Sequence, residues 1–418
     1  MKIKKMSIFE VWYYVLVALS TGVFLILPAK LDFWRNVLTW LLLLFTLVYF
    51  ATQKIPRRQI KILFGTYVIV FISIVTIESL LSIEKYGYTF EEFFYGIRQY
   101  LWFLAVIPLF FMMKKKGIDT ILRGTIVVTS ISLTIRFLTW FIHLISGIVL
   151  FPNILYEYGI LWGRNGSVRI DASPLIGVVV VALYYFYNKT KAKRYLMGIA
   201  LVLGYLIIVT QSRTIILSSL ACLIIMFVLK KRKSNRQFLI FFFVIVIFSI
   251  GFQIGIFDKL LEYLNLDKGP EGLGYRYYEF SYFLSLLRHG NWKLGIGILS
   301  QKNSMANSVL FGNLDTQMYI EDIGILEMFV QFGLLSIPLY LFLYLSLFVV
   351  MKKCFKLGYS NYGVLLLGLL SYLFIVSIPL NLFSIQRSFS LPIILAIMGY
   401  IESEIKMRDK SKLSMLKQ

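Results

Sequence analysis

The sequence predicts an all-α protein: a polytopic transmembrane bundle of about twelve helices with one large extracytoplasmic loop between the ninth and tenth. Its composition is 59% hydrophobic and only 15% charged. Apolar stretches such as Ile60–Leu81 and Phe238–Ile256 approach the roughly 20 residues needed to cross a hydrocarbon core of about 30 Å. They are apolar on every face, whereas barrel strands alternate in polarity over about ten residues. Because only helices and closed barrels satisfy the backbone in lipid, a helical bundle follows.

We expect residues 1–418 to form a single integral membrane domain, with residues 257–321 as the large loop within it. The expected spans are residues 8–27, 33–51, 60–81, 98–113, 125–147, 173–188, 195–210, 214–230, 237–256, 322–350, 361–380 and 388–403. The first span follows a basic pentapeptide, as in a signal peptide, but no small-residue cleavage site follows it, so we expect it to stay as a helix. The connection Ser82–Arg98 is acidic and aromatic, and is interpreted as an interfacial helix.

The net charge of +22 follows the expected topology. Most of the 43 Lys and Arg residues fall on the side of the N-terminus, whereas the opposite side is neutral overall. Basic connections mark the cytoplasmic side of a membrane protein, so both termini are expected in the cytoplasm and the protein in the cytoplasmic membrane. Anionic membrane lipids are the expected partners of this charge. Nucleic acid is not needed to explain it.

The cysteines and histidines indicate neither a disulfide nor a metal site. Cys222 lies within an apolar span and Cys354 follows a cytoplasmic lysine pair, so the two cannot meet. His143 and His289 are isolated in the sequence, and metal sites need clustered ligands. We therefore expect no metal and no other cofactor.

The first candidate for chemistry is Arg213, in a tight connection between two spans at the outer surface. The segment reads Gln211-Ser212-Arg213-Thr214. Arginine is always charged and its planar fork can engage phosphate oxygens bidentately. The alternative is that Arg213 only extends toward lipid headgroups.

The large loop contains a second candidate arginine, Arg276, in an aromatic segment that predicts a helix reaching His289. Aromatic faces can stack on sugar rings, and an arginine among them could hold a pyrophosphate. The alternative is an interfacial helix in which Arg276 and Glu279 form an i,i+3 pair. The helix is followed by Gly295-Ile296-Gly297.

Acidic residues gather where the large loop enters the tenth span. They are Asp315, Glu321 and Asp322. Asp322 is either the N-cap of that span or a general base at the membrane surface. Asp315 and Glu321 are candidates for binding the substrate in the same place.

Two charged residues fall inside predicted spans, and two more arginines lie in the second-largest outer segment. A charge near mid-bilayer costs at least about 2.5–3.5 kcal/mol, so Arg136 and Glu327 should each face a partner or a wet cavity. They could line a substrate cavity or pair with each other. Arg164 and Arg169 could hold an anionic ligand or lie in a solvated loop.

These features together resemble the O-antigen polymerase and O-antigen ligase superfamily. Ser212-Arg213 resembles the start of the family's conserved region, and Arg276 with Gly295-Ile296-Gly297 resembles its arginine helix ending in Gly-x-Gly. Asp322 with Gly333 resembles the stretch in which ligases carry histidine. The aspartate is a departure that leaves the identity of a base open. It favours the polymerases of capsule, exopolysaccharide or O-antigen repeat units over the ligases.

The resemblance implies an inverting, metal-independent glycosyltransferase. Its donor and acceptor would be oligosaccharides linked to undecaprenyl pyrophosphate, with Arg213, Arg276 and Asp322 as catalytic residues. The expected protein partners are a chain-length regulator and a flippase. Two alternatives stay open. A flippase for the lipid-linked unit would share the span number and the basic loops but would not need a large outer loop. A ligase would transfer the glycan to another acceptor.

Overall fold

The computed structural model describes residues 7–27, 31–53, 66–155, 163–164, 167–170, 173–229, 273–311, 318–384, 387 and 389–415. The α-helices are α1 (Ile8–Ser20), α2 (Leu31–Thr52), α4 (Thr66–Tyr86), α5 (Phe90–Leu101), α6 (Val106–Lys116), α7 (Ile118–Ser146), α8 (Pro152–Leu155), α9 (Ile176–Thr190), α10 (Lys193–Tyr205), α11 (Arg213–Leu229), α14 (Leu273–Leu286), α15 (Ser304–Phe311), α16 (Ile325–Phe332), α17 (Ser336–Lys356), α18 (Ser360–Ser377) and α19 (Ser390–Met415). The short elements are the 3-10 turns η1 (Val23–Ile26), η2 (Trp102–Ala105), η5 (Ile320–Ile323) and η6 (Gly333–Leu335), the π-turns η3 (Leu206–Thr210) and η4 (Leu287–Asn291), and the hairpin strands β1 (Gly163–Arg164) and β2 (Ser167–Val168).

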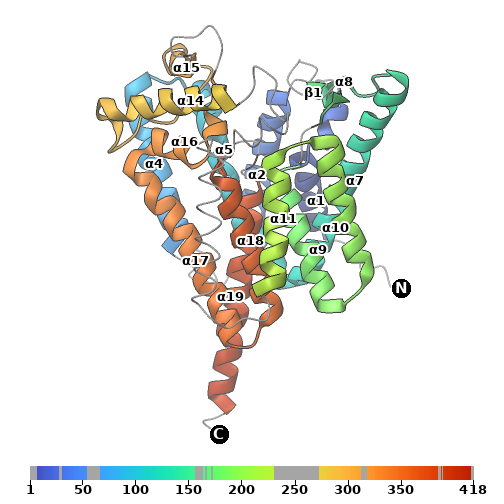
Figure 1. The fold of residues 1–418 in the computed structure, drawn as a ribbon. Helices are drawn as coiled ribbons and strands as arrows, with labels where there is room; N and C mark the ends of the chain where they lie inside the picture. Colours follow the sequence, from blue (N-terminus) through green and yellow to red (C-terminus); the bar gives the residue numbers. More distant parts are fainter. Residues whose placement is uncertain are drawn as a thin grey trace.

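The predicted fold class, a polytopic bundle of apolar helices, is confirmed (Figure 1). Within the described ranges, 7 helical stretches are long and apolar enough to cross a membrane, and two shorter apolar helices accompany them. The predicted span 237–256 lies outside those ranges, so the number of twelve spans stays a prediction.

Several predicted boundaries differ from the structure: α1 ends at Ser20 rather than residue 27, and α7 begins at Ile118 rather than residue 125. Two further differences bear on the site. The stretch from Phe90 to Lys116 forms one continuous span made of α5, η2 and α6. The segment expected to form an interfacial helix therefore supplies the first turns of this span. Arg98 lies within the span. The predicted tenth span is divided at Gly333, whose φ of 51° ends α16 before α17 begins.

Helix α18 lies at the centre of the bundle and packs against α9, α11 and α17 (Figure 1). Two glycines allow this close packing. A Cβ at Gly368 would collide with the Met226 sulfur, and one at Gly177 would collide with the Tyr372 ring. Small residues at helix interfaces bring backbones together in this way within membranes. Tyr372 belongs to α18 and Gly177 to α9, so α18 is fixed against helices on two sides.

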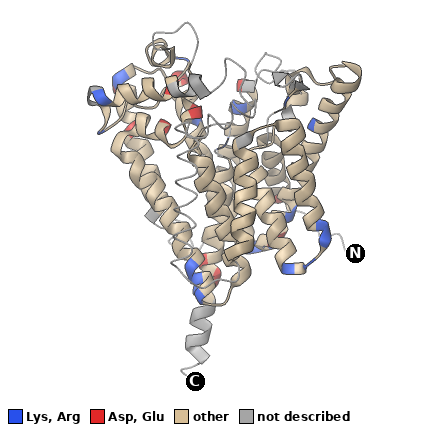
Figure 2. Ribbon diagram, viewed as in Figure 1, with Lys and Arg blue, Asp and Glu red and all other residues tan. Residues whose placement is uncertain are grey.

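The bundle has two ends of different character. We call the end where α1 starts, α6 meets α7 and α19 leaves the bundle the terminal face. Basic residues gather there (Figure 2), in short pairs such as Lys116–Glu10 at 2.9 Å and Lys114–Glu404 at 2.9 Å. We call the other end, which carries α14 and η5, the opposite face.

The opposite face is covered by a segment with an apolar cluster of its own. We call residues 273–311 and 318–323 the cap. The helix α14 lies across this face, with α15 above it (Figure 1). The buried side chains of the cluster are Phe283, Leu287, Ile296, Leu310, Met318, Ile320, Ile323 and Val330. Because Val330 belongs to α16, the cap is anchored to the bundle through that helix.

Candidate functional site

The acidic turn η5, which carries Glu321 and Asp322, is pressed against the end of α18. Gly324 follows the turn with a φ of +62°, and a Cβ there would collide with the carbonyl of Ile378. The backbone N–H of Asn381 donates a hydrogen bond to the backbone carbonyl oxygen of Glu321, at 3.3 Å. Only glycine permits this backbone-to-backbone approach. Gly324 therefore fixes the position of the preceding turn, which carries Glu321 and Asp322.

The helix α16 begins after this turn, at Ile325. Its N-cap is Gly324, and no side chain caps its first turn. Asp322 lies within η5 instead. The expectation that Asp322 is the N-cap of this span is therefore wrong.

Three arginines from separate elements act on Glu321. Burial raises the pKa of the Glu321 carboxyl, and the positive charges of Arg387, Arg35 and Arg98 oppose that shift without cancelling it. Arg387 gives the largest opposing effect and lies in the connection between α18 and α19. Arg35 belongs to α2 and Arg98 to α5. The acidic turn thus lies within electrostatic reach of cations from three parts of the chain, and the second carboxylate of the turn, Asp322, acts against them.

Arg98 is held rigidly. Its Nη2 donates to Asp32 at 2.8 Å and its Nη1 donates to Asn36 at 2.6 Å. Its guanidinium lies 3.8 Å from the centre of the Tyr95 ring, and the residue is 3% exposed. Asp32 also lies 3.6 Å from Arg35. Contacts on both edges and one face leave the guanidinium a single orientation, which a lysine could not reproduce.

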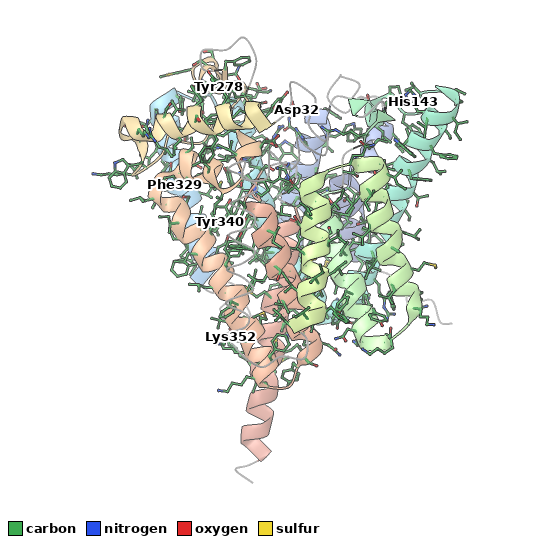
Figure 3. The ribbon with its side chains drawn as sticks, in the orientation of Figure 1. Asp32, His143, Tyr278, Phe329, Tyr340 and Lys352 are labelled. Carbon is green, nitrogen blue, oxygen red and sulfur yellow. The ribbon has the colours of Figure 1, made fainter. Side chains whose placement is uncertain are left out.

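Four buried polar side chains lie beneath the acidic turn, those of Glu327, Gln331, Tyr340 and Asn381. Gln331 donates to the Glu327 carboxylate at 2.9 Å, and Tyr340 donates to the Asn381 amide oxygen at 3.3 Å. Glu327 is 2% exposed. Figure 3 shows Tyr340 partway down α17, between the cap and Lys352 at the terminal face. Glu327, which the sequence places inside the tenth span, therefore has a polar partner, Gln331, on its own helix.

Arg136 lies in another part of the bundle. It is 4% exposed, and its guanidinium stands where a Cβ of Gly22 would be, beside the end of α1. Its helix, α7, lies at the right of Figure 1, whereas α16 lies at the left. These contacts favour separate surroundings for Arg136 and Glu327 over the expected alternative that they pair.

The arginine helix α14 is joined directly to the acidic turn. Glu279 accepts a hydrogen bond from the Tyr319 amide at 2.7 Å, just before η5 begins. Arg276 lies one helical turn earlier in α14. Its side chain is outside the described part of the structure, so the expected Arg276–Glu279 pair stays a prediction.

Gly295 and Gly297 serve the fold rather than a ligand. The Ile296 amide donates to the Val330 carbonyl at 2.8 Å, and the Gly297 amide donates to the Gln331 carbonyl at 2.9 Å. The two glycines have φ values of 77° and 88°, and a Cβ at Gly295 would collide with the carbonyl of Gln331. The segment satisfies carbonyls at the end of α16, which a helix leaves unpaired.

The hairpin before Arg213 is as tight as the sequence predicts. The π-turn η3 is closed by Gln211, which has a φ of 53°. Its backbone N–H donates a hydrogen bond to the backbone carbonyl of Leu206 at 2.8 Å. Helix α11 then begins at Arg213. The Ile170 amide donates to Val209 in η3 at 3.2 Å, so the chain next to Arg169 lies against this hairpin.

The packing of α11 on α18 sets the depth of Arg213. Met226 of α11 lies opposite Gly368 of α18, and the two helices are antiparallel. At about 1.5 Å per residue, Arg213 lies about 20 Å above that crossing. Helix α18 ends at Ser377, so by the same rise it reaches about 14 Å above the crossing. The start of α11 and the end of α18 therefore both lie toward the opposite face.

The remaining candidates are only partly described. Arg164 belongs to the short strand β1, paired with Ser167 of β2, and its side chain is outside the described residues. Trp140 donates to the Val168 carbonyl at 2.7 Å, which ties this hairpin to α7. Asp315 lies outside the described residues.

Sequence reasoning missed Arg35, Arg98, Arg387 and Glu279. Asp32, at the start of α2, binds Arg98 across a tertiary contact. A signal was available. The positive-inside rule does not account for arginines on the outer side. Arg35 lies in the first turns of α2, and Arg387 lies in the connection before α19. Arg98 lies eight residues into the span that begins at Phe90.

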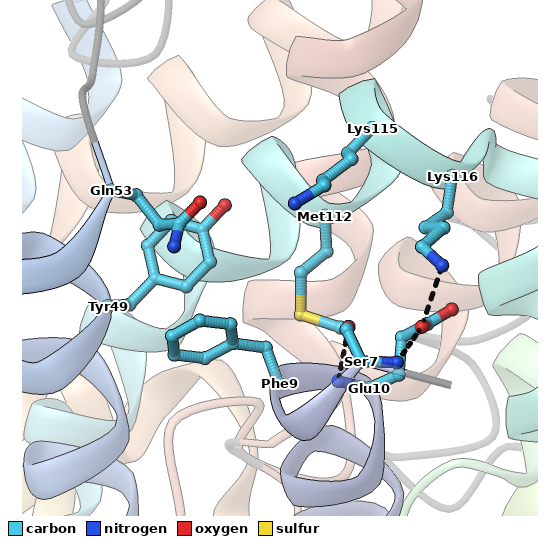
Figure 4. A pocket seen from close by; sticks show the side chains of 8 residues that line it. All are labelled: Ser7, Phe9, Glu10, Tyr49, Gln53, Met112, Lys115 and Lys116. Atoms are coloured by element: carbon cyan, nitrogen blue, oxygen red, sulfur yellow. Dashed lines mark hydrogen bonds and ion pairs between the residues drawn. The ribbon is translucent and has the colours of Figure 1, made fainter. Parts of the chain in front are cut away.

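A hollow at the terminal face is a separate feature (Figure 4). Its lining residues are Ser7, Phe9, Glu10, Tyr49, Gln53, Met112, Lys115 and Lys116. The Glu10 carboxylate is already engaged by the Ser7 amide at 2.7 Å and by Lys116 at 2.9 Å. These contacts close the start of α1 and leave no free acid for chemistry.

The opposite face combines the half-buried carboxylates of the acidic turn with arginines from separate helices, of which Arg98 is held by Asp32 and Asn36. Residues 196–341 match the family described as O-antigen ligase. The match includes the Arg213 hairpin, the arginine helix and the acidic turn. The predicted resemblance to the O-antigen polymerase and ligase superfamily is confirmed over this third of the chain, and with it the general class of membrane glycosyl-transfer enzymes. No curated protein matches the chain.

Proposed function

We propose that the protein is a polysaccharide repeat-unit polymerase, an inverting glycosyltransferase acting on the outer side of the cytoplasmic membrane. It would join oligosaccharides carried on undecaprenyl pyrophosphate. One observation carries the proposal most directly. The acidic turn of Glu321 and Asp322 belongs to the segment that matches the family, and the charges of three arginines from other segments act on Glu321 at the face opposite both termini. The terminal face is then cytoplasmic, in agreement with its basic residues.

The arginines suit the departing group of such a reaction. When the bond from the sugar C1 to the pyrophosphate oxygen breaks, negative charge develops on the lipid pyrophosphate. Fixed cations that meet this charge lower the barrier, because they need no rearrangement during the reaction. Arg213 and Arg276 are the proposed contacts for the pyrophosphate. Arg387, which acts most strongly on Glu321, is added to them.

The acidic turn suits the acceptor. An acceptor hydroxyl attacks C1 from the face opposite the pyrophosphate and passes its proton to a carboxylate, so the configuration at C1 inverts. Asp322 or Glu321 would take this proton. The raised pKa of Glu321 makes its ionised form a stronger base than an ordinary carboxylate. Such a reaction balances without a metal or another cofactor.

Exposed aromatic side chains on the cap suit the glycans. Tyr278, Trp292 and Tyr319 are 41%, 47% and 61% exposed, and aromatic faces can stack on sugar rings. Arg169 and Arg164, beside the Arg213 hairpin, are proposed to contact the second lipid-linked unit. Arg136 is proposed to line its path. A chain-length regulator and a flippase are the proposed protein partners.

The test is glycan chain length in cells that lack the protein, with lipid-linked intermediates assigned to each side of the membrane by an impermeant probe. The polymerase predicts single repeat units that accumulate on the outer side. Units trapped on the cytoplasmic side would instead identify a flippase.

The family description favours one second candidate, a ligase that transfers the glycan to another acceptor. Purified protein given only lipid-linked repeat units separates the two. A polymerase lengthens them without any other acceptor, whereas a ligase leaves them as single units.

A further inference from the structure

Glu279 is a buried acid that the proposed chemistry does not use. It lies in α14 and is 1% exposed. Its carboxylate accepts the Tyr319 amide at 2.7 Å. The side-chain oxygen at the end of two methylenes reaches this amide directly, so the length of the side chain sets the distance between the two segments.

The register of α14 connects this contact to the proposed site. Phe283 and Leu287 are buried in the cluster of the cap, and Glu279 precedes Phe283 by about one turn. Residues three or four apart share a face of a helix, so position 276 falls on the same stripe. The stripe packs on η5, which carries Glu321 and Asp322. The Glu279–Tyr319 bond thus lies between the arginine helix and the acidic turn.

A second tether on α14 leads elsewhere and serves as a control. The Tyr282 hydroxyl donates to the Val309 carbonyl of α15 at 3.0 Å. This bond joins two helices of the cap without touching the acidic turn. Loss of the Tyr282 hydroxyl should therefore loosen the cap without moving the arginine helix relative to the acids.

We propose that Glu279 is a positioning residue, which sets the spacing between the arginine helix and the acidic turn. The inference rests on the proposed function, because the spacing matters only if both elements act on one substrate. Its basis is the length and acceptor geometry of the side chain. Glutamine preserves both, whereas aspartate keeps the charge but is shorter by one methylene.

The experiment uses full-length protein in lipid nanodiscs with purified lipid-linked repeat units. Variants Glu279→Gln, Glu279→Asp, Glu279→Ala and the control Tyr282→Phe are compared for kcat, KM and hydrogen exchange of the Tyr319 amide. Misplacement by about 1 Å can cost about 100-fold in rate. We expect kcat to fall at least about tenfold in the aspartate and alanine variants with little change in KM. Both should exchange the Tyr319 amide faster, whereas the glutamine and phenylalanine variants should stay near wild type.

Three results would overturn the proposal. One is wild-type kcat in the aspartate variant. Another is a glutamine variant as inactive as alanine, which would mean that the charge matters and not the spacing. The third is unchanged exchange of the Tyr319 amide in the alanine variant. Normal polymer from both Arg213→Ala and Arg276→Ala would instead defeat the proposed function, and the exchange measurement would still report on the bond itself.

Discussion

The two ends of the bundle use charge in different ways. At the terminal face, the described ion pairs each join one lysine to one carboxylate: Lys114–Glu404, Lys116–Glu10, Lys189–Asp119 and Lys406–Glu402. At the opposite face, Asp32 is shared by Arg98 and Arg35, and the charges of three arginines act on Glu321. One lysine pair, Lys302–Glu91, lies there as well, exposed at the rim of the cap.

The difference separates topology from chemistry. A lysine extends a flexible stem into water and carries a well-hydrated point charge, which is enough to mark the cytoplasmic side. An arginine fork is less strongly hydrated and can be fixed in a dry place by several contacts. Arg98 is buried and contacted on its edges and one face, whereas the paired lysines of the terminal face range from 12% exposed at Lys114 to 48% at Lys406 and each meets one carboxylate. The arginines of the opposite face are therefore better candidates for function than the more numerous lysines.

The largest effect is expected from removing the arginines proposed to hold pyrophosphate. Arg213→Ala and Arg276→Ala should each abolish polymer while single repeat units still form, because the developing charge on the leaving group loses its cation. Chain-length analysis of extracted glycan measures this. Lys352→Ala at the terminal face is the matched control and should make normal polymer. Normal polymer from both arginine variants would defeat the assignment.

A swap of cation type tests the comparison itself. Arg98→Lys keeps the charge but loses the two-sided contact with Asp32 and Asn36, and hydrogen bonds to charged groups are worth about 1.5–3 kcal/mol. We expect turnover to fall about tenfold or more. Lys114→Arg at the terminal face should change turnover by less than about twofold, because it keeps the charge beside Glu404 at the end of the bundle away from the acidic turn. Equal effects of the two swaps would remove the distinction between the faces.

A smaller effect is expected in the dependence on pH. The pKa of Glu321 lies above its ordinary value of 4.5 because of burial, so the folded protein holds this proton more tightly than the unfolded chain. The resulting stability is complete below pH 4.5 and is lost as pH rises through the raised pKa. Activity should rise over the same range, because only the ionised form accepts a proton. Thermal unfolding and turnover measured between pH 4.5 and 9 report both trends.

Glu321→Gln is the control for this titration. It cannot ionise, so its unfolding temperature should vary less with pH than that of the wild type. Its turnover should stay low throughout the range. An unchanged pH profile in this variant would exclude Glu321 as the titrating group.

The smallest effect is expected from an exposed pair at the terminal face. Lys189→Met should cost less than about 1 kcal/mol of unfolding free energy, because exposed ion pairs are screened by solvent. Polymer length should not change. A loss of polymer here would mean that the terminal face contributes to the chemistry, contrary to the comparison.

The sequence predicted the parts of the site that depend on neighbours along the chain. The hairpin before Arg213 and the aromatic helix containing Arg276 are present. Predictions failed where distant segments meet. Asp322 is not the N-cap of α16, because the close approach of Gly324 to Ile378 ends the turn first. Arg387 was not selected, because its effect on Glu321 arises across a tertiary contact.

The sequence by itself determined that this chain is a helical membrane bundle, because the length and apolarity of each span are local properties. It also carried the resemblance to the O-antigen polymerase and ligase superfamily, through short motifs in a fixed order. Only the tertiary structure decided which charges share one place. The grouping of Glu321 with Arg35, Arg98 and Arg387 depends on how helices from three parts of the chain pack. Helix packing of this kind follows from side-chain shape across interfaces, which no local pattern encodes.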